Sequence, residues 1–176
     1  GSGKSTILNM IAGIDRPNTG DVLVGGQNLG DLNQEALVDF RKKNIGFVFQ
    51  AFHLIPHLNV FQNIALPCLL LDWRFTEIKK KITSILEIID LDDKQNVLPN
   101  NLSGGEQQRV AIARAIIHGP KLVLADEPTG NLDSRNTEIV LNLLVDQCNK
   151  NHSTLVVVTH SEFVAKRMKK KNKINI

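Results

Sequence analysis

Short apolar segments that alternate with longer helical segments constrain the fold of this chain more than any other feature of its sequence. Residues 122–125 (LVLA) and 155–159 (LVVVT) read as buried strands, separated by a helix predicted from about Asn136 to Lys150. Further strands are predicted at residues 21–24 (DVLV) and 45–49 (IGFVF). Such alternation is typical of a parallel sheet covered on both faces, so we predict an α/β fold with a mostly parallel sheet.

The middle of the chain reads as helices without strands. The predicted helices are NVFQNIAL, TEIKKKITSILEIIDL and LSGGEQQRVAIARAIIHGP, and the second carries a stripe of isoleucine and leucine on one face. We therefore expect one domain over residues 1–176. Its core would comprise residues 1–50 and 118–176, and about residues 51–117 would form an inserted α-helical subdomain.

Composition excludes several classes of protein. The chain has 176 residues, of which 42% are hydrophobic, enough for one globular core. Its net charge of +3 is concentrated in KRMKKKNK near the C-terminus, so we expect no nucleic-acid partner. Cys68 and Cys148 form no disulfide or metal motif. The stretch IALPCLLL is far shorter than the ~20 residues that a membrane helix needs.

The chain begins with GSGKST, which matches the end of the phosphate-loop motif G-x-x-x-x-G-K-[ST]. Backbone N–H groups of such a loop surround phosphate oxygens, and the helix that follows adds its dipole. The candidate nucleotide ligands are Gly1, Ser2, Gly3, Lys4, Ser5 and Thr6. Lys4 would reach the β- and γ-phosphates, and Ser5 would hold Mg²⁺. The alternative is a turn before an ordinary helix.

Two carboxylates follow the apolar segment LVLA. Carboxyl ends of parallel strands are where such folds place ligands. Asp126 suits Mg²⁺, and Glu127 could accept a proton from an attacking water, which is typically worth ~10²–10⁴-fold in rate. A solvated acidic loop is the alternative, but a phosphate loop upstream favours the catalytic interpretation.

The segment LSGGEQQR has two interpretations that are compatible. Ser103 and Glu106 match a capping box, S-x-x-E, at the start of a helix. Gly104 and Gly105 would also leave the helix N-terminus bare, which creates an anion site from exposed N–H groups.

The stretches LSGGEQQRVAIARAI and LVLADEPTGNLD together resemble the nucleotide-binding subunits of ABC transporters, and the resemblance runs from Gly1 to about Val164. ADEPTGNLD and FVFQAFHLIPHLNVFQNIALP further resemble the subgroup of lipoprotein-release, macrolide- or peptide-export and cell-division ATPases. The resemblance implies a P-loop NTPase fold with a RecA-like core, ATP and Mg²⁺ as cofactors, and ATP hydrolysis that powers export or lipoprotein extraction.

The resemblance also assigns catalytic roles. Asp126 matches the Walker B aspartate, which binds Mg²⁺, and Glu127 matches the catalytic glutamate. Gln50 in FVFQ matches the Q-loop glutamine, which reaches Mg²⁺ and links to the helical insertion. His160 in VVVTH matches the switch histidine on the γ-phosphate.

A second set of residues is implied to act between two subunits. Ser103, Gly104 and Gly105 match the signature that contacts the γ-phosphate bound by the opposite subunit, and Asp133 in GNLD matches the D-loop aspartate at the dimer interface. The resemblance thus implies a homodimer that ATP closes and hydrolysis opens.

The implied partner is a membrane permease subunit, which the helical insertion would drive from the cytoplasmic face with mainly indirect membrane contact. Phe52, Leu54, Ile55 and Leu58 follow Gln50 and are candidates for the docking face. They could equally form the core of the insertion.

The ends of the chain depart from the family pattern. The family has a strand and an adenine-stacking aromatic residue before the phosphate loop, and further strands after the switch histidine. We therefore expect a chain shortened at both ends, which as written folds poorly and binds ATP weakly. Burial of each large apolar side chain contributes ~1.5–3 kcal/mol. Loss of a central strand with several of them would therefore cost about as much as the whole free energy of unfolding of a domain, ~5–15 kcal/mol. Ser161 replaces the usual acid after His160 but also caps a helix.

Other functions share parts of this pattern. An ATP-gated module of the cell-division type would transmit a mechanical signal without transport and needs the same site. A DNA-repair or chromosome-structure ATPase would place a very long coiled coil between Lys4 and Ser103, which this sequence lacks. A paired-domain translation factor needs a second set of motifs, and a pseudo-ATPase fits poorly with intact Glu127 and His160.

Overall fold

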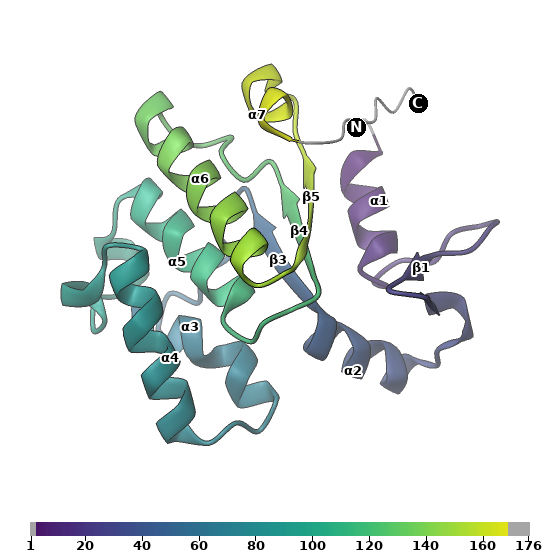
Figure 1. Ribbon diagram of the computed structural model, residues 1–176, viewed down its shortest axis with the longest axis horizontal. Coiled ribbons are helices and arrows are strands. Elements are labelled where there is room, and N and C mark those ends of the chain that lie inside the picture. The colour runs from purple at the N-terminus through teal and green to yellow at the C-terminus, as the bar shows by residue number, and fades with distance from the viewer. Residues whose placement is uncertain (1–2, 169–176) are drawn as a thin grey trace.

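Parallel strands form the centre of the protein in a computed structural model that describes residues 3–168 (Figure 1). They are β3 (Ile45–Phe49), β4 (Leu122–Asp126) and β5 (Thr154–Val158), in the spatial order β3-β4-β5. Both pairings are parallel, and their register aligns Phe49, Asp126 and Val158 at the carboxyl ends. The predicted α/β fold with a mostly parallel sheet is confirmed.

The helices predicted from the sequence are present, with ends shifted by a few residues. The α-helices are α1 (Lys4–Ile11), α2 (Gln34–Asn44), α3 (Val60–Leu70), α4 (Phe75–Ile88), α5 (Gly104–Ile116), α6 (Ser134–Lys150) and α7 (Glu162–Arg167). Short 3₁₀ helices are η1 (Leu29–Asp31), η2 (Asp92–Lys94) and η3 (Pro99–Asn101). None of the helices in residues 3–168 has the length and apolar character to span a bilayer.

Polar side chains define where many of these helices begin. The N-cap residues Asn33, Asn59, Ser103, Asp133 and Ser161 each accept a hydrogen bond from the main-chain N–H three residues later. Such a cap satisfies one of the N–H groups that the first helical turn leaves without a partner. The predicted capping roles of Ser103 and Ser161 are therefore observed.

The predicted strand at residues 21–24 lies outside the parallel sheet. Only Leu23–Val24 forms a strand, β1, which pairs antiparallel with β2 (Gln27–Asn28). Gly25 and Gly26 connect the two strands with φ values of 58° and 83°. A two-residue hairpin requires positive φ at both turn positions, and the Gly-Gly pair is its sequence signal.

Two hydrophobic clusters cover the two faces of the sheet. The large core combines side chains of α3, α4, α5 and α6 with Val48, Val123 and Ala125 of the strands. The small core joins Leu8 and Ala12 of the α1 segment to the other face of β4. Figure 1 shows α5 and α6 on one side of the strands and α1 on the other. Successive β4 residues alternate between the two cores, so this strand is apolar throughout.

One glycine sets the distance between β3 and α5. A Cβ at Gly46 would lie 2.0 Å from the carbonyl oxygen of Ala115, a main-chain atom of α5. Only a residue without a side chain allows this approach, which brings α5 onto the sheet. The large core is continuous from the helices to the strands, and a separate helical subdomain over residues 51–117 remains a prediction.

Candidate functional site

Most sequence-predicted catalytic residues lie at one edge of the sheet. Gln50 directly follows β3, Asp126 ends β4 and Glu127 follows it, while His160 comes two residues after β5. Because the strands are parallel and in register at these ends, all of these residues leave the sheet on the same side.

Glu127 is held in one orientation by its own backbone and by two donors. Its φ of 45° lies in the left-handed region, which few non-glycine residues adopt. Its Oε2 accepts a hydrogen bond from Thr159 Oγ1 at 2.9 Å, and its Oε1 accepts one from the His160 main-chain N–H at 2.5 Å. Thr159 and His160, which follow β5, therefore fix the orientation of the Glu127 carboxylate, which follows β4.

The side chains of Lys4 and His160 lie close together although they are far apart in the sequence. Gly3, with a φ of 62°, precedes α1 and turns the chain into the helix. Lys4 Nζ lies 3.4 Å from His160 Nδ1, and His160 Nε2 lies 3.9 Å from Glu127 Oε1. The His160 side chain is 72% exposed, so it remains accessible to a ligand. The structure thus brings the start of α1, the end of β4 and the end of β5 together.

The remaining phosphate-loop candidates sit in the first turn of α1. Ser5 and Thr6 are exposed there, whereas Gly1 and Ser2 lie outside the described residues. The proposed metal ligands Ser5, Gln50 and Asp126 offer hydroxyl, amide and carboxylate oxygens. Such hard donors fit Mg²⁺, which keeps several waters and takes few protein ligands. No group of three or more His, Cys, Asp or Glu side chains within residues 3–168 is arranged to hold a metal.

Gln50 has a partner that sequence reasoning missed. Its Nε2 donates to Asn131 Oδ1 at 3.1 Å, and Asn131 Nδ2 donates to the Gln50 carbonyl at 3.1 Å. A Cβ at Gly130 would lie 2.7 Å from Gln50 Nε2, so the glycine leaves room for the amide. The signal for Asn131 was its position between Gly130 and Asp133 in TGNLD.

The signature segment starts α5 with a complete capping box. Glu106 N–H donates to Ser103 Oγ at 3.4 Å, and Glu106 Oε2 accepts from Ser103 N and Oγ at 2.8 Å each. Glu106 also pairs with Lys94, which with the Ser103 donors lowers the pKa of Glu106 to about 2. Ser103 itself is exposed, and no hydrogen bond or ion pair joins it to Glu127 or His160.

Asp133 and Gly105 are linked through Asn136. Asp133 accepts from Asn136 N–H at 2.8 Å and from Asn136 Nδ2 at 2.7 Å, and these bonds lower the pKa of Asp133. A Cβ at buried Gly105 would lie 2.4 Å from Asn136 Oδ1. Within this chain, the glycine therefore allows the starts of α5 and α6 to pack closely.

The candidate docking residues after Gln50 divide between core and surface. Leu54 packs against the large core, whereas Ile55 is 41% exposed. The segment is fixed by buried Asn63, whose Oδ1 accepts from Ile55 N–H at 2.8 Å and whose Nδ2 donates to the Leu58 carbonyl at 2.7 Å. Phe52 and Leu58 are half-buried.

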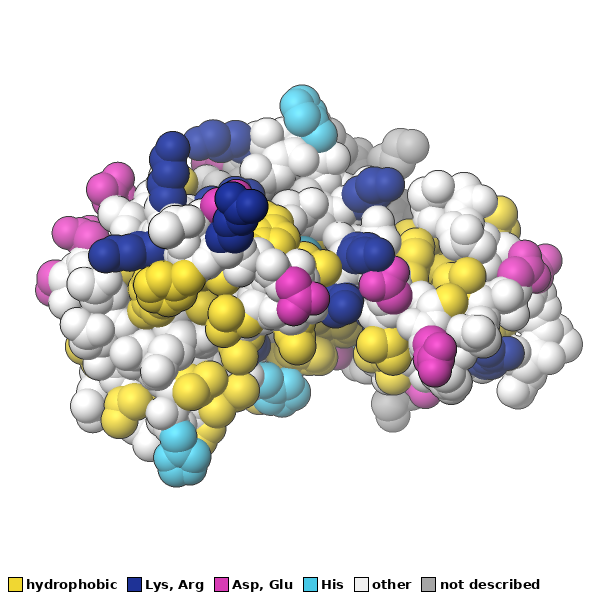
Figure 2. Space-filling view, turned by 90° about the horizontal axis from the view of Figure 1, so that it is seen from below, with side chains coloured by type: hydrophobic (Ala, Val, Ile, Leu, Met, Phe, Trp, Pro, Cys, Tyr) yellow, Lys and Arg dark blue, Asp and Glu magenta, His cyan; other side chains and the backbone are white. Residues whose placement is uncertain are grey.

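Apolar side chains also reach the surface nearby. Figure 2 shows hydrophobic side chains gathered over the helical part of the molecule, with Lys and Arg above them in this view. The exposed large residues of α3 and α4 are Leu69, Leu70, Phe75 and Ile88. Such a surface can serve as a contact for a partner.

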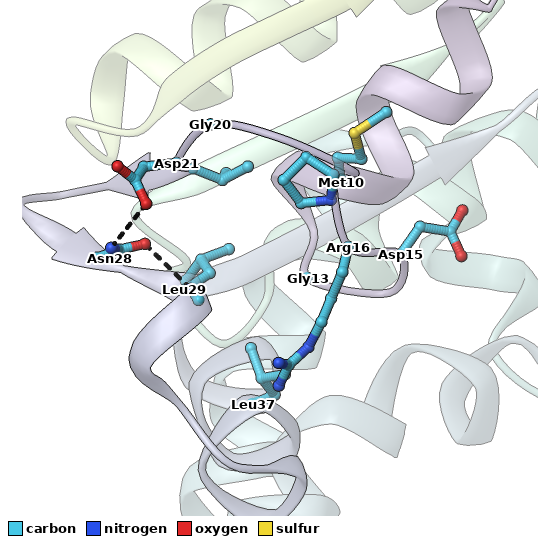
Figure 3. Close-up of a pocket in the computed structure, with 12 residues that line it drawn as sticks. Met10, Gly13, Asp15, Arg16, Gly20, Asp21, Asn28, Leu29 and Leu37 are labelled. Atoms are coloured by element: carbon cyan, nitrogen blue, oxygen red, sulfur yellow. Dashed lines mark hydrogen bonds between the residues drawn. The ribbon is translucent and has the colours of Figure 1, made fainter.

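A cavity of about 170 Å³ lies at the opposite end of α1 from Lys4 (Figure 3). Met10 and Leu37 line it, and Asn28 Nδ2 donates to Asp21 Oδ1 at 3.3 Å on its wall. None of the sequence-predicted site residues lines this cavity, so it is separate from the nucleotide site.

Known proteins match this chain over most of its length. The model of the family described as "ABC transporter" matches residues 1–130. The lipoprotein-releasing system ATP-binding protein LolD of Treponema denticola is 43% identical over 165 residues, which span 94% of this chain and 73% of LolD.

Solved structures agree with this match. The dimeric structure of MJ0796, described as a bacterial ABC transporter cassette, has a TM-score of 0.83 at 43% identity and covers 94% of this chain and 73% of its own. A dimeric post-hydrolysis state of MJ0796 bound to ADP and Pi has a TM-score of 0.83 at 42% identity, with the same coverage. Because the family model and these relatives each match most of the chain, it belongs to the ABC transporter family as an ATP-binding cassette.

Proposed function

We propose that this ATPase powers lipoprotein extraction or export through a membrane permease subunit, with Mg²⁺ as the cofactor of ATP. The observation that supports the proposal best is the arrangement of Lys4, Glu127 and His160 at one edge of the sheet. Lys4 supplies a cation that binds phosphate. Glu127 supplies a carboxylate that accepts a proton from water, and His160 contacts the terminal phosphate.

Glu127 acts as the general base in this proposal. Its carboxylate accepts the proton of the water that attacks the γ-phosphate, a role typically worth ~10²–10⁴-fold in rate. Thr159 and the main-chain N–H of His160 hold the carboxylate in place. A pre-oriented base needs no rearrangement when the substrate arrives.

The start of α1 binds the phosphates. Residues 1–6 supply main-chain N–H groups and the Lys4 ammonium, while His160 contacts the γ-phosphate. Ser5, Gln50 and Asp126 would hold Mg²⁺, which would neutralise charge on the phosphate oxygens.

A second copy of the chain completes each site. Ser103, Gly104 and Gly105 contact the γ-phosphate held by the opposite subunit, and Asp133 lies at the interface. The exposure of Ser103, which within one chain has no hydrogen bond to Glu127 or His160, supports this division. So does the similarity to MJ0796, whose structures are described as dimeric.

The membrane partner is engaged by the helical part of the chain, which we propose to be a subdomain over about residues 51–117. Exposed apolar side chains such as Ile55 support a docking face there. The protein would act at the cytoplasmic face of the membrane. Its similarity to LolD, a protein named for lipoprotein release, favours transport over the signal-transmitting alternative.

Substitution of the base tests the proposal. In the full-length protein, Glu127→Gln should lower ATP turnover by ~10²–10⁴-fold while ATP binding persists, because the amide cannot accept the proton. Glu35→Gln, an exposed carboxylate in the first turn of α2, is the matched control and should leave turnover unchanged. Equal turnover in the two variants would rule out Glu127 as the base.

A further inference from the structure

Arg114 lies in the last turn of α5 and contacts the segment that follows Gln50. Its Nη1 donates to the His53 carbonyl at 2.7 Å, and its Nη2 donates to the Phe52 carbonyl at 2.9 Å. The planar guanidinium presents its donors as a rigid fork, which fits two adjacent acceptors. One side chain therefore donates hydrogen bonds to two successive carbonyl groups.

The segment that accepts these hydrogen bonds has an unusual backbone. Phe52 and His53 have φ values of 60° and 48°, both in the left-handed region. Two successive non-glycine residues keep this conformation only when their surroundings hold them in it. The His53 ring also packs on Phe49 at the end of β3, with ring centroids 4.5 Å apart. The chain thus bends sharply just after Gln50, and Arg114 holds the bend.

Within residues 3–168, Arg114 has no carboxylate partner that would hold it elsewhere. Burial lowers the pKa of Arg114 from its ordinary value, which reflects the cost of placing its charge away from water. The two carbonyls are therefore the groups that compensate this partly buried cation, and losing them would leave it without these hydrogen bonds.

Both ends of α5 lie near the segment that follows Gln50, because a Cβ at Gly104, the first residue of the helix, would lie 3.7 Å from Phe52 Cζ. Its 13 residues form one continuous helix that begins immediately after Ser103 and ends two residues after Arg114. On the other side, Asn131 holds both the side chain and the carbonyl of Gln50. Gln50 and its following bend are consequently tied to the β4 side by Asn131 and to α5 by Arg114.

We propose that Arg114 is a positioning residue that fixes the segment after Gln50 to α5. A displacement of Gln50 is then passed along the helix to the signature residues at its start. This inference rests on the proposed ATPase function of the site and adds a coupling residue to it.

Arg114→Lys tests the proposal in the full-length protein, since lysine keeps the charge but loses the fork. We expect kcat to fall by ~10–100-fold, as for other residues that orient a functional group, and half-activation to need more Mg²⁺. The KM for ATP should stay within about twofold, because phosphate contacts are unchanged. Arg41→Lys is the matched control: Arg41 donates to the Gly13 carbonyl at 2.7 Å, away from Gln50, and should leave kcat and the Mg²⁺ requirement unchanged.

Turnover and Mg²⁺ dependence of Arg114→Lys equal to those of the control would overturn the proposal. If this variant does not fold, amide hydrogen exchange on the unaltered protein provides the test. Adding ATP should then change exchange in residues 52–54 and in the last turn of α5 together, and a change in only one of them would overturn the proposal. Failure of the proposed function is distinguishable, because it would appear as absent turnover in the unaltered protein.

Discussion

The two faces of the parallel sheet are covered to very different depths. On one face, α3, α4, α5 and α6 share the large core, whereas on the other Leu8 and Ala12 meet only a few side chains of the strands. The thinly attached helix, α1, is the one that carries Lys4 and Ser5. Elements with few buried apolar contacts open at low free energy, so we expect α1 to be the less stable part. A ligand bound by its first turn would then stabilise it.

The largest expected effect comes from a substitution that disrupts packing on the well-covered face of the sheet. Gly46→Ala places a Cβ against the Ala115 carbonyl, so α5 must move off β3. We expect the free energy of unfolding to fall by more than about 3 kcal/mol, measured by urea denaturation. Gly30→Ala is the control, because its Cβ would lie 3.3 Å from a side-chain atom of Asn28, which can shift. Equal losses in both variants would contradict the close approach of α5.

A paired truncation compares the two faces directly. Ile82 in the large core and Leu8 in the small core are each 0% exposed. Large-to-small substitutions in cores cost about 2–5 kcal/mol, and we expect Ile82→Ala to cost more than Leu8→Ala. Hydrogen exchange should show that Leu8→Ala speeds exchange in α1 alone. Equal costs with global loosening in both variants would show that the faces are equally stable.

The smallest effect concerns the start of α5 and depends on pH. The bonds from Lys94 and Ser103 lower the pKa of Glu106 from 4.5 to about 2. A lowered pKa in the folded state means that the carboxylate stabilises the fold above pH 4.5 and that this contribution is lost as the pH falls from about 4.5 to about 2. Glu106→Gln should therefore cost about 1–2 kcal/mol at pH 7, and the cost should shrink with acidification.

The measurement is the difference in unfolding free energy between Glu106→Gln and the unaltered protein at several pH values. Glu87→Gln, an exposed carboxylate of α4, serves as the control and should show no such pH dependence. A difference for Glu106→Gln that stays constant with pH would mean that its carboxylate has no special stabilising role.

The sequence by itself determined the three parallel strands, many of the helix starts and the edge where the catalytic candidates lie. Apolar runs marked β3, β4 and β5, because strands covered on both faces are mostly apolar. Capping residues such as Ser103 marked helix starts, since their role depends only on neighbours in the chain. The positions of Asp126, Glu127 and His160 followed from parallel strands that end at a common edge.

Tertiary structure alone decided which atoms meet across those elements. The contacts of Arg114 with Phe52, of Asn131 with Gln50 and of Gly105 with Asn136 join segments far apart in the chain or on different helices. Periodicity shows which face of an element is buried, but it carries no information about the atom that this face will contact. That choice depends on how closely two backbones approach, which packing of the whole core sets.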